Sequence, residues 1–247
     1  MTLIKLIKQN DENRYHQGIF ANNLTRKDIY KFARDAQFFR NDAELFPKML
    51  RQFLIQTLNW GNFDRVVGRF KRNINSEGLI TGINDFNSYS NAFIKTIEND
   101  GIEEIFNKFN MPSDLKIDNI GFAYFTKFLH FYSYGADTPS KMLIMDKWAI
   151  LAFCALMIET SHKNIELTTK LTSKVQNGFT VKYENINSKI YVYYNELIFK
   201  LSNDLSISPA RFEELMFGWG IRENRYGFQN PRITIIAKLN DYFKSIN

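Results

Sequence analysis

The chain of 247 residues contains a single cysteine, Cys154, and only three histidines. One cysteine excludes an intrachain disulfide and any zinc site built from several cysteines of the chain. His16, His130 and His162 are far apart in the sequence and lack the short spacing of metal ligands. We therefore expect no metal site.

Several motifs of nucleotide-binding and membrane proteins are also missing. The sequence has no Walker-type glycine-lysine loop, no G-x-G-x-x-G fingerprint and no G-x-S-x-G nucleophile elbow. Its longest apolar run, WAILAFCALMI, is about half of a membrane span. The opening segment, MTLIKLIKQNDENRY, is too short and too soon charged for a secretory signal. These absences disfavour the phosphate-cradling nucleotide folds and predict a cytoplasmic protein without a membrane segment.

The composition that remains is that of an ordinary globular protein with a basic surplus. Hydrophobic residues make up 45% of the chain and charged residues 23%. Lysine and arginine number 32 against 26 acidic residues, which gives a formal net charge of +6. This surplus suits a nucleic-acid partner, although many basic proteins bind no polyanion, so charge alone does not decide.

Apolar residues recur at steps of three and four along most of the chain, which is the period of amphipathic helices. Only GFTVKY, residues 178–183, alternates like a strand. The sequence predicts an all-α protein that forms one helical unit over residues 1–247, which could divide into lobes 1–110 and 111–247 around a cleft. Helices are expected within 25–39, 42–60, 84–100, 145–161, 183–205, 208–220 and 231–243, with breaks at 75–85, 110–118 and 134–141. The helix at 208–220 is expected to start with Ser208 as its cap and Pro209 at its first helical position.

One lysine, Lys127, lies inside the apolar and aromatic segment NIGFAYFTKFLHF. An amine attacks carbon only when it is deprotonated, and an exposed lysine has a pKa of about 10.4. Burial and the positive end of a helix would lower this pKa toward about 7–8, which is low enough for a Schiff base with a sugar carbon. The rings expected to bury the amine are those of Phe122, Phe125, Phe128 and Phe131.

Asp146 follows nineteen residues after Lys127, where the next helix begins. Its carboxylate could stabilise the positive charge of an oxocarbenium-like sugar, and as an N-cap it would be held by backbone N–H groups. Each residue also has a simpler interpretation. Asp146 could be a helix cap only, and Lys127 could be a surface lysine whose stem covers apolar surface.

Taken together, the segments IGFAYFTKFLHF and LIMDKWAI resemble the helix-hairpin-helix DNA glycosylases, specifically the bifunctional 8-oxoguanine glycosylase/AP-lyase branch. The segment YNELIFKLSNDLSISPARFEELMFGWGIRE resembles the C-terminal region of small bacterial proteins of this kind. The likeness covers Leu115–Glu159 and Tyr194–Glu223. It implies that Lys127 is the nucleophile, that Asp146 is the catalytic carboxylate, and that no organic cofactor is needed.

The hairpin departs from the pattern that the resemblance implies, which is Leu-Pro-Gly-apolar-Gly with the lysine two positions later. Here Gly121 is the segment's only glycine, no Pro-Gly precedes it, and Lys127 follows six residues later. We therefore expect a remodelled hairpin or a helix that already starts near Asn119. The backbone N–H groups around Gly121 are candidates for phosphate binding, because a helix start binds phosphate without side chains.

A second candidate for DNA binding is the segment FDRVVGRFKRNI, which places Arg65, Arg69 and Arg72 on one helical stripe. Such a stripe can follow the phosphates of a DNA strand, or it can simply be a solvated face.

A flipped base needs an aromatic or apolar pocket. The segment FGWGIRENRYGF offers Phe217 and Trp219, in the region where the family places part of its pocket. His130 lies one turn after Lys127 and could also touch the site. The simpler interpretations are core packing for the rings and a packed, neutral state for the histidine.

The leading hypothesis is a monomeric DNA glycosylase with AP-lyase activity that flips a modified purine, such as 8-oxoguanine, out of duplex DNA. An alternative is a catalytically inactive or antiviral-system DNA-binding module of the same fold, because small relatives occur beside bacterial antiviral genes. A third is a helical interaction protein without DNA affinity, which a salt-dependent DNA-binding assay would separate from the first two.

Overall fold

The computed structural model describes residues 2–13, 24–64, 75–161, 165–176, 178–217 and 229–246. These residues form helices and a single two-stranded sheet, so the predicted all-α class is confirmed. The chain consists of two compact units, whose limits differ from the expected lobes 1–110 and 111–247. The lysine unit is Gly18–Ile144, and the aspartate unit combines Met1–Gln17 with Met145–Asn247.

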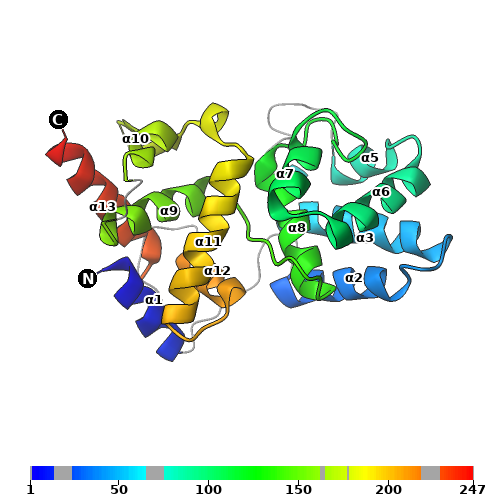
Figure 1. Ribbon diagram of the computed structural model, residues 1–247, viewed down its shortest axis with the longest axis horizontal. Helices are drawn as coiled ribbons and strands as arrows, with labels where there is room; N and C mark the ends of the chain where they lie inside the picture. Colours follow the sequence, from blue (N-terminus) through cyan, green and yellow to red (C-terminus); the bar gives the residue numbers. More distant parts are fainter. Residues whose placement is uncertain are drawn as a thin grey trace. The chain divides into compact units, whose positions relative to one another are not determined.

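The lysine unit is built around α8 (Phe122–Gly135), most of whose residues are buried. Helices α2, α3 and α7 all pack against it, and Figure 1 shows the blue and cyan helices of this unit beside green α8. Tyr132 of α8 makes edge contacts with the rings of Phe53 and Phe93, at centroid distances of 5.7 and 4.9 Å. The other helices described here are α2 (Arg26–Phe38), α3 (Leu45–Trp60), α5 (Ser76–Thr81), α6 (Phe86–Asn99) and α7 (Ile102–Asn110).

Helix α2 approaches α8 very closely at Gly135. A Cβ atom at this position would lie 2.6 Å from Cβ of Ala33 and 2.7 Å from the carbonyl oxygen of Tyr30. Both distances are shorter than any real carbon contact, so only glycine lets the two helices cross here. This crossing brings α2 beside the face of α8 that carries His130.

The aspartate unit is built around α9 (Lys147–Glu159), whose middle residues are fully buried. Helices α1, α10, α12 and α13 and strand β2 pack against it. Phe153 of α9 contacts the rings of Tyr193 and Tyr194 on α11. The remaining elements are α1 (Leu3–Glu12), α10 (Leu167–Leu171), β1 (Thr172–Val175), β2 (Gly178–Val181), η2 (Tyr183–Asn185), α11 (Ser188–Asp204), α12 (Pro209–Phe217) and α13 (Pro231–Ser245).

Glu159, at the end of α9, fixes the N-terminal helix to the C-terminal part of the chain. Its two carboxylate oxygens accept the backbone N–H groups of Leu3 and Ile4 at 2.6 and 2.9 Å, which satisfies donors at the start of α1. Lys238 of α13 lies 3.3 Å from the same carboxylate. One acidic side chain therefore joins α1, α9 and α13.

The structure refines the expected pattern of elements in several places. The predicted strand is present as β2, and it pairs in antiparallel register with β1, which the sequence did not predict. The expected break at 75–85 contains the short helix α5, with Asn75 as its N-cap. The expected Ser208 cap is confirmed, because its Oγ accepts the N–H of Arg211 at 3.2 Å. Within the described residues, no helix has both the length and the apolar character needed to cross a membrane.

Candidate active-site residues

Helix α8 begins at Phe122, so the expectation of a helix start near Asn119 is wrong. Asn119 instead has a φ of 65°, the left-handed conformation that glycine usually supplies in a tight turn. Gly121 is the N-cap, with no side-chain capping bond, and its carbonyl oxygen accepts the N–H of Tyr124 at 2.9 Å. The loop between α7 and α8 therefore turns with an asparagine, which supports the alternative expectation of a remodelled hairpin.

Lys127 lies in the buried part of α8 and is only 6% exposed. Its Nζ atom donates a hydrogen bond to the carbonyl oxygen of Ala123 at 2.7 Å, one turn toward the helix start. The amine also lies 5.1 Å from the centre of the Tyr124 ring. Both neighbours stabilise a protonated amine, so the amine has to leave them and lose a proton before it can act as a nucleophile.

The phenylalanines expected around Lys127 belong to different faces of α8. Phe125 packs against Phe106 and Phe109 of α7, with centroid distances of 5.1 and 5.8 Å. Phe131 contacts Trp60 at the end of α3. Residues three and four positions away share a face with the lysine, so this spacing places Phe131 on the face of Lys127 and Phe125 on another. Tyr124 meets that spacing, and this is the signal that could have singled it out in the sequence.

His130 is completely buried and both of its ring nitrogens have partners. Nδ1 lies 3.0 Å from the carbonyl oxygen of Met142, which can only accept, so the neutral ring carries its proton on Nδ1. Nε2 then accepts from the hydroxyl of Tyr30 at 2.9 Å and from Arg26 at 3.3 Å. Burial and the positive charge of Arg26 hold the pKa of His130 well below its usual value. These contacts favour the packed, neutral histidine over a role in the base pocket.

Asp146 is the N-cap of α9, as expected. Its Oδ1 atom accepts the backbone N–H groups of Trp148 at 2.9 Å and of Ala149 at 3.2 Å. The carboxylate is thus fixed by two bonds that both use the same oxygen, and only one methylene separates it from the backbone. Such an arrangement suits a group that must hold a negative charge in a constant position.

Tyr183, in η2, lies within electrostatic reach of Asp146. Burial of its ring and the negative charge of Asp146 both raise the pKa of the Tyr183 hydroxyl. The residue is nevertheless 46% exposed. Nothing in the sequence connects Tyr183 with Asp146, because the two are far apart along the chain.

The first turn of α9 is also held by Arg232, a buried arginine that the sequence gave no reason to select. Its guanidinium group lies 4.3 Å from the centre of the Trp148 ring. Its Nε atom donates a hydrogen bond to the carbonyl oxygen of Phe217 at 2.9 Å. Arg232 therefore links α13 to the last residue of α12 and to the helix turn that Asp146 caps. Phe217, expected in the base pocket, is 4% exposed and takes part in this packing.

Comparison with known proteins identifies the family to which this chain belongs. The sequence pattern of the family described as "Putative 8-oxoguanine DNA glycosylase OGG-like protein" matches residues 7–217. The chain belongs to this OGG-like family. No curated protein and no solved structure matches it. The match includes both Lys127 and Asp146.

Four of the residues expected to contact DNA or the base lie outside the described residues of this OGG-like protein. They are the arginine stripe and the tryptophan of the C-terminal segment: Arg65, Arg69, Arg72 and Trp219. Their roles remain predictions.

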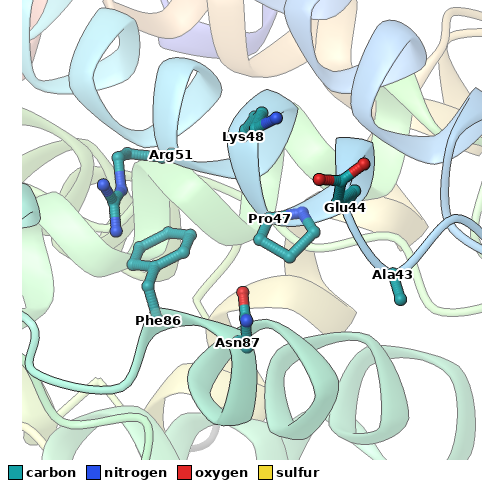
Figure 2. Close-up of a pocket in the computed structure, with 7 residues that line it drawn as sticks. All are labelled: Ala43, Glu44, Pro47, Lys48, Arg51, Phe86 and Asn87. Atoms are coloured by element: carbon teal, nitrogen blue, oxygen red, sulfur yellow. The ribbon is translucent and has the colours of Figure 1, made fainter.

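Two pockets of the OGG-like protein lie along the outer face of α3. The first has a volume of about 390 Å³, and Figure 2 shows the Arg51 side chain beside the Phe86 ring, 4.4 Å from its centre. The second, of about 370 Å³, shares Lys48 and Arg51 with the first. Glu44 lines the first pocket and Glu77 the second, so the two lining sets together contain two basic and two acidic side chains. Neither lining set contains a candidate catalytic residue.

Proposed function

We propose that this protein is a DNA glycosylase with AP-lyase activity, acting as a monomer on a modified purine, such as 8-oxoguanine, that is flipped out of duplex DNA. The observation that carries the proposal is a buried lysine on the helix after a tight turn, followed by an aspartate that caps the next helix. The family description supports the glycosylase class. The lyase activity rests on the chemistry of Lys127.

In the first step, the neutral amine of Lys127 attacks C1′ of the flipped nucleotide. A bond forms between Nζ and C1′ while the bond from C1′ to the base nitrogen breaks and its electron pair leaves with the base. The proton that the new ammonium loses balances the charge of the departing base. Asp146, fixed through Oδ1, provides the negative charge that stabilises the cationic sugar as this bond breaks.

In the second step, the sugar ring opens at O4′, which takes up a proton, and a protonated Schiff base remains between Nζ and C1′. Loss of a proton from C2′ then expels the 3′ phosphate, whose oxygen keeps the electron pair of the broken bond to C3′. Water finally releases the lysine by hydrolysis of the Schiff base. This sequence needs a lysine that is available as a neutral amine, and it needs no organic cofactor.

Borohydride trapping tests the proposal, because the reagent reduces the Schiff base to a permanent link between protein and DNA. The substrates are duplexes that contain 8-oxoguanine, other modified purines or a preformed abasic site. We expect a covalent adduct with the wild-type protein and none with Lys127→Gln. An adduct that persists in Lys127→Gln would show that another amine reacts. If the wild-type protein gave no adduct with any of these substrates, the lyase activity would be refuted.

The second candidate function is a DNA-binding module that has the glycosylase fold but is catalytically inactive. The observation in its favour is the resting amine itself, which is held by a carbonyl and a ring that both stabilise its protonated form. Such a module would bind DNA in a salt-dependent manner and give no adduct in the trapping assay.

A further inference from the structure

Gly61 is placed against Lys127 in a way that its backbone conformation does not explain. It follows the last residue of α3 as the C-cap, with φ −70° and ψ 0°. Every L-amino acid adopts these right-handed angles without strain, so the turn itself does not require glycine. The reason for a residue without a side chain has to be sought in the space around it.

That space is occupied by the reactive lysine and its neighbouring ring. A Cβ atom at position 61 would lie 3.3 Å from Cδ of Lys127 and 3.3 Å from Cε1 of Tyr124. Both distances are tighter than ordinary carbon contacts, so one neighbour would have to move by a few tenths of an ångström. The Tyr124 ring is packed edge-on against Phe63, with a centroid distance of 5.0 Å. The flexible lysine stem is therefore the group that would yield.

We propose that Gly61 is a positioning residue for the nucleophile. The bare Cα of Gly61, the Tyr124 ring and the carbonyl oxygen of Ala123 form three sides of an amine slot, in which the stem and the amine of Lys127 are held. This inference rests on the proposed function of Lys127 and deepens it. Gly61, the C-cap of α3, thus helps to place the amine of Lys127 on α8 for its attack on C1′.

The expected effect follows from how strictly a nucleophile must be placed. Misplacement of a reacting atom by about 1 Å can cost roughly a hundredfold in rate. Gly61→Ala should therefore slow formation of the trapped adduct about tenfold, and Gly61→Val about a hundredfold. DNA affinity should stay the same in both variants, because the slot holds the lysine and not the phosphates.

Gly82→Ala provides a matched control within the lysine unit. Gly82 is the C-cap of α5 with φ −74° and ψ −3°, close to the angles of Gly61. A Cβ there would meet only carbonyl oxygens of its own helix, those of Gly78 and Leu79. This variant should trap at the wild-type rate, so that any general effect of an alanine at a helix end can be subtracted.

The experiment measures the single-turnover rate of trapping on abasic-site duplex, the dissociation constant for the same DNA without borohydride, and the melting temperature. A slower rate in Gly61→Ala with unchanged affinity and melting temperature supports the slot. A rate equal to that of wild type overturns it. Should Gly61→Ala melt lower, its rate is compared at a temperature where every variant is folded.

A second readout keeps the inference testable if the wild-type protein forms no adduct and the proposed function fails. Lysine labelled with ¹³C at Cε gives one NMR signal for each lysine, and loss of a signal in Lys127→Gln identifies the one of interest. The slot predicts that Gly61→Ala shifts this signal and that Gly82→Ala does not. An unshifted signal in Gly61→Ala would overturn the slot whatever the activity.

Discussion

Helices α8 and α9 carry the two candidate catalytic residues, and the starts of these helices are built in opposite ways. Helix α9 begins with a carboxylate that binds two of its own backbone N–H groups. Helix α8 begins with Gly121, which makes no side-chain capping bond, and its charged residue lies further along, inside the helix. One charge is part of the helix cap, whereas the other is carried at the end of a long flexible stem.

This difference matches the different tasks of the two groups. A carboxylate that stabilises a developing cation works best when it does not move, because reorganising a charge during the reaction costs free energy. A nucleophile has to approach carbon closely and form a bond, so Lys127 needs freedom in its four methylene groups. The amine slot limits that freedom to one path, and the carbonyl of Ala123 holds the amine at one end of it.

The largest expected effect separates the two residues by the step that each serves. Asp146→Asn should lower base excision by about 10²–10³-fold, because the cationic sugar loses its counter-charge. The same variant should trap on preformed abasic DNA with a much smaller loss, since no base departs from that substrate. Lys127→Gln should abolish trapping on both substrates. Product release and adduct yield are measured by gel electrophoresis.

The contrast between the substrates makes this prediction specific. If Asp146→Asn lost excision and abasic-site trapping to the same extent, the carboxylate would serve attack by the amine and not departure of the base. Asparagine keeps an oxygen that can cap α9, so a loss of folding is not expected.

The next effect concerns Arg232, which supports the first turn of α9, the turn that Asp146 caps. Arg232→Met keeps much of the side-chain volume but removes the donor to Phe217 and the cation beside Trp148. We expect the free energy of unfolding to fall by about 2–3 kcal/mol, because a buried carbonyl loses a charge-assisted hydrogen bond. Urea denaturation followed by tryptophan fluorescence and circular dichroism measures the change.

Arg211→Met is the matched control for this loss. Arg211 bridges Asp11 and Glu214 at 2.8 and 3.0 Å, in positions that water partly reaches. Its removal should cost about 1 kcal/mol or less. Equal losses for the two arginines would contradict a special role of Arg232 beneath the first turn of α9.

The sequence predicted those features that are local along the chain. Asp146 was recognised as a cap because it directly precedes an apolar helix, and Ser208 because a proline follows it. Gly61 and Arg232 were missed, because their roles depend on contacts with residues distant in the sequence. Asn119 was missed for a different reason. Any residue before a helix can belong to its first turn, and only the backbone angle shows that the chain turns there.

The burial of His130 on α8 predicts that the free energy of unfolding depends on pH. Its pKa in the folded protein lies below the unfolded value of 6.5, mainly through burial and then through the charge of Arg26. The free energy of unfolding is therefore highest above pH 6.5. It decreases as the pH falls, because His130 takes up a proton in the unfolded chain but not in the folded protein. The loss should be about 1 kcal/mol at pH 5.5.

Replacing this histidine with a neutral side chain isolates its contribution. His130→Asn should be less stable than wild type at pH 7.5, but the gap should narrow by about 1 kcal/mol at pH 5.5. The other two histidines are present in both proteins, so their titration cancels in the difference. A gap independent of pH would mean that the pKa of His130 is the same in the folded and the unfolded protein.

The smallest effect returns to the two helix starts themselves. Asp146→Ala should lower the free energy of unfolding by about 1 kcal/mol, because two N–H groups of α9 lose their acceptor, while Asp146→Asn should change it much less. Gly121→Ala is the corresponding change at α8, where a Cβ would meet no atom within 4 Å. It should alter stability by less than about 0.5 kcal/mol, since no side-chain cap is lost. Equal costs at the two positions, measured by thermal unfolding, would remove the distinction between a helix start fixed by a carboxylate and one formed by backbone alone.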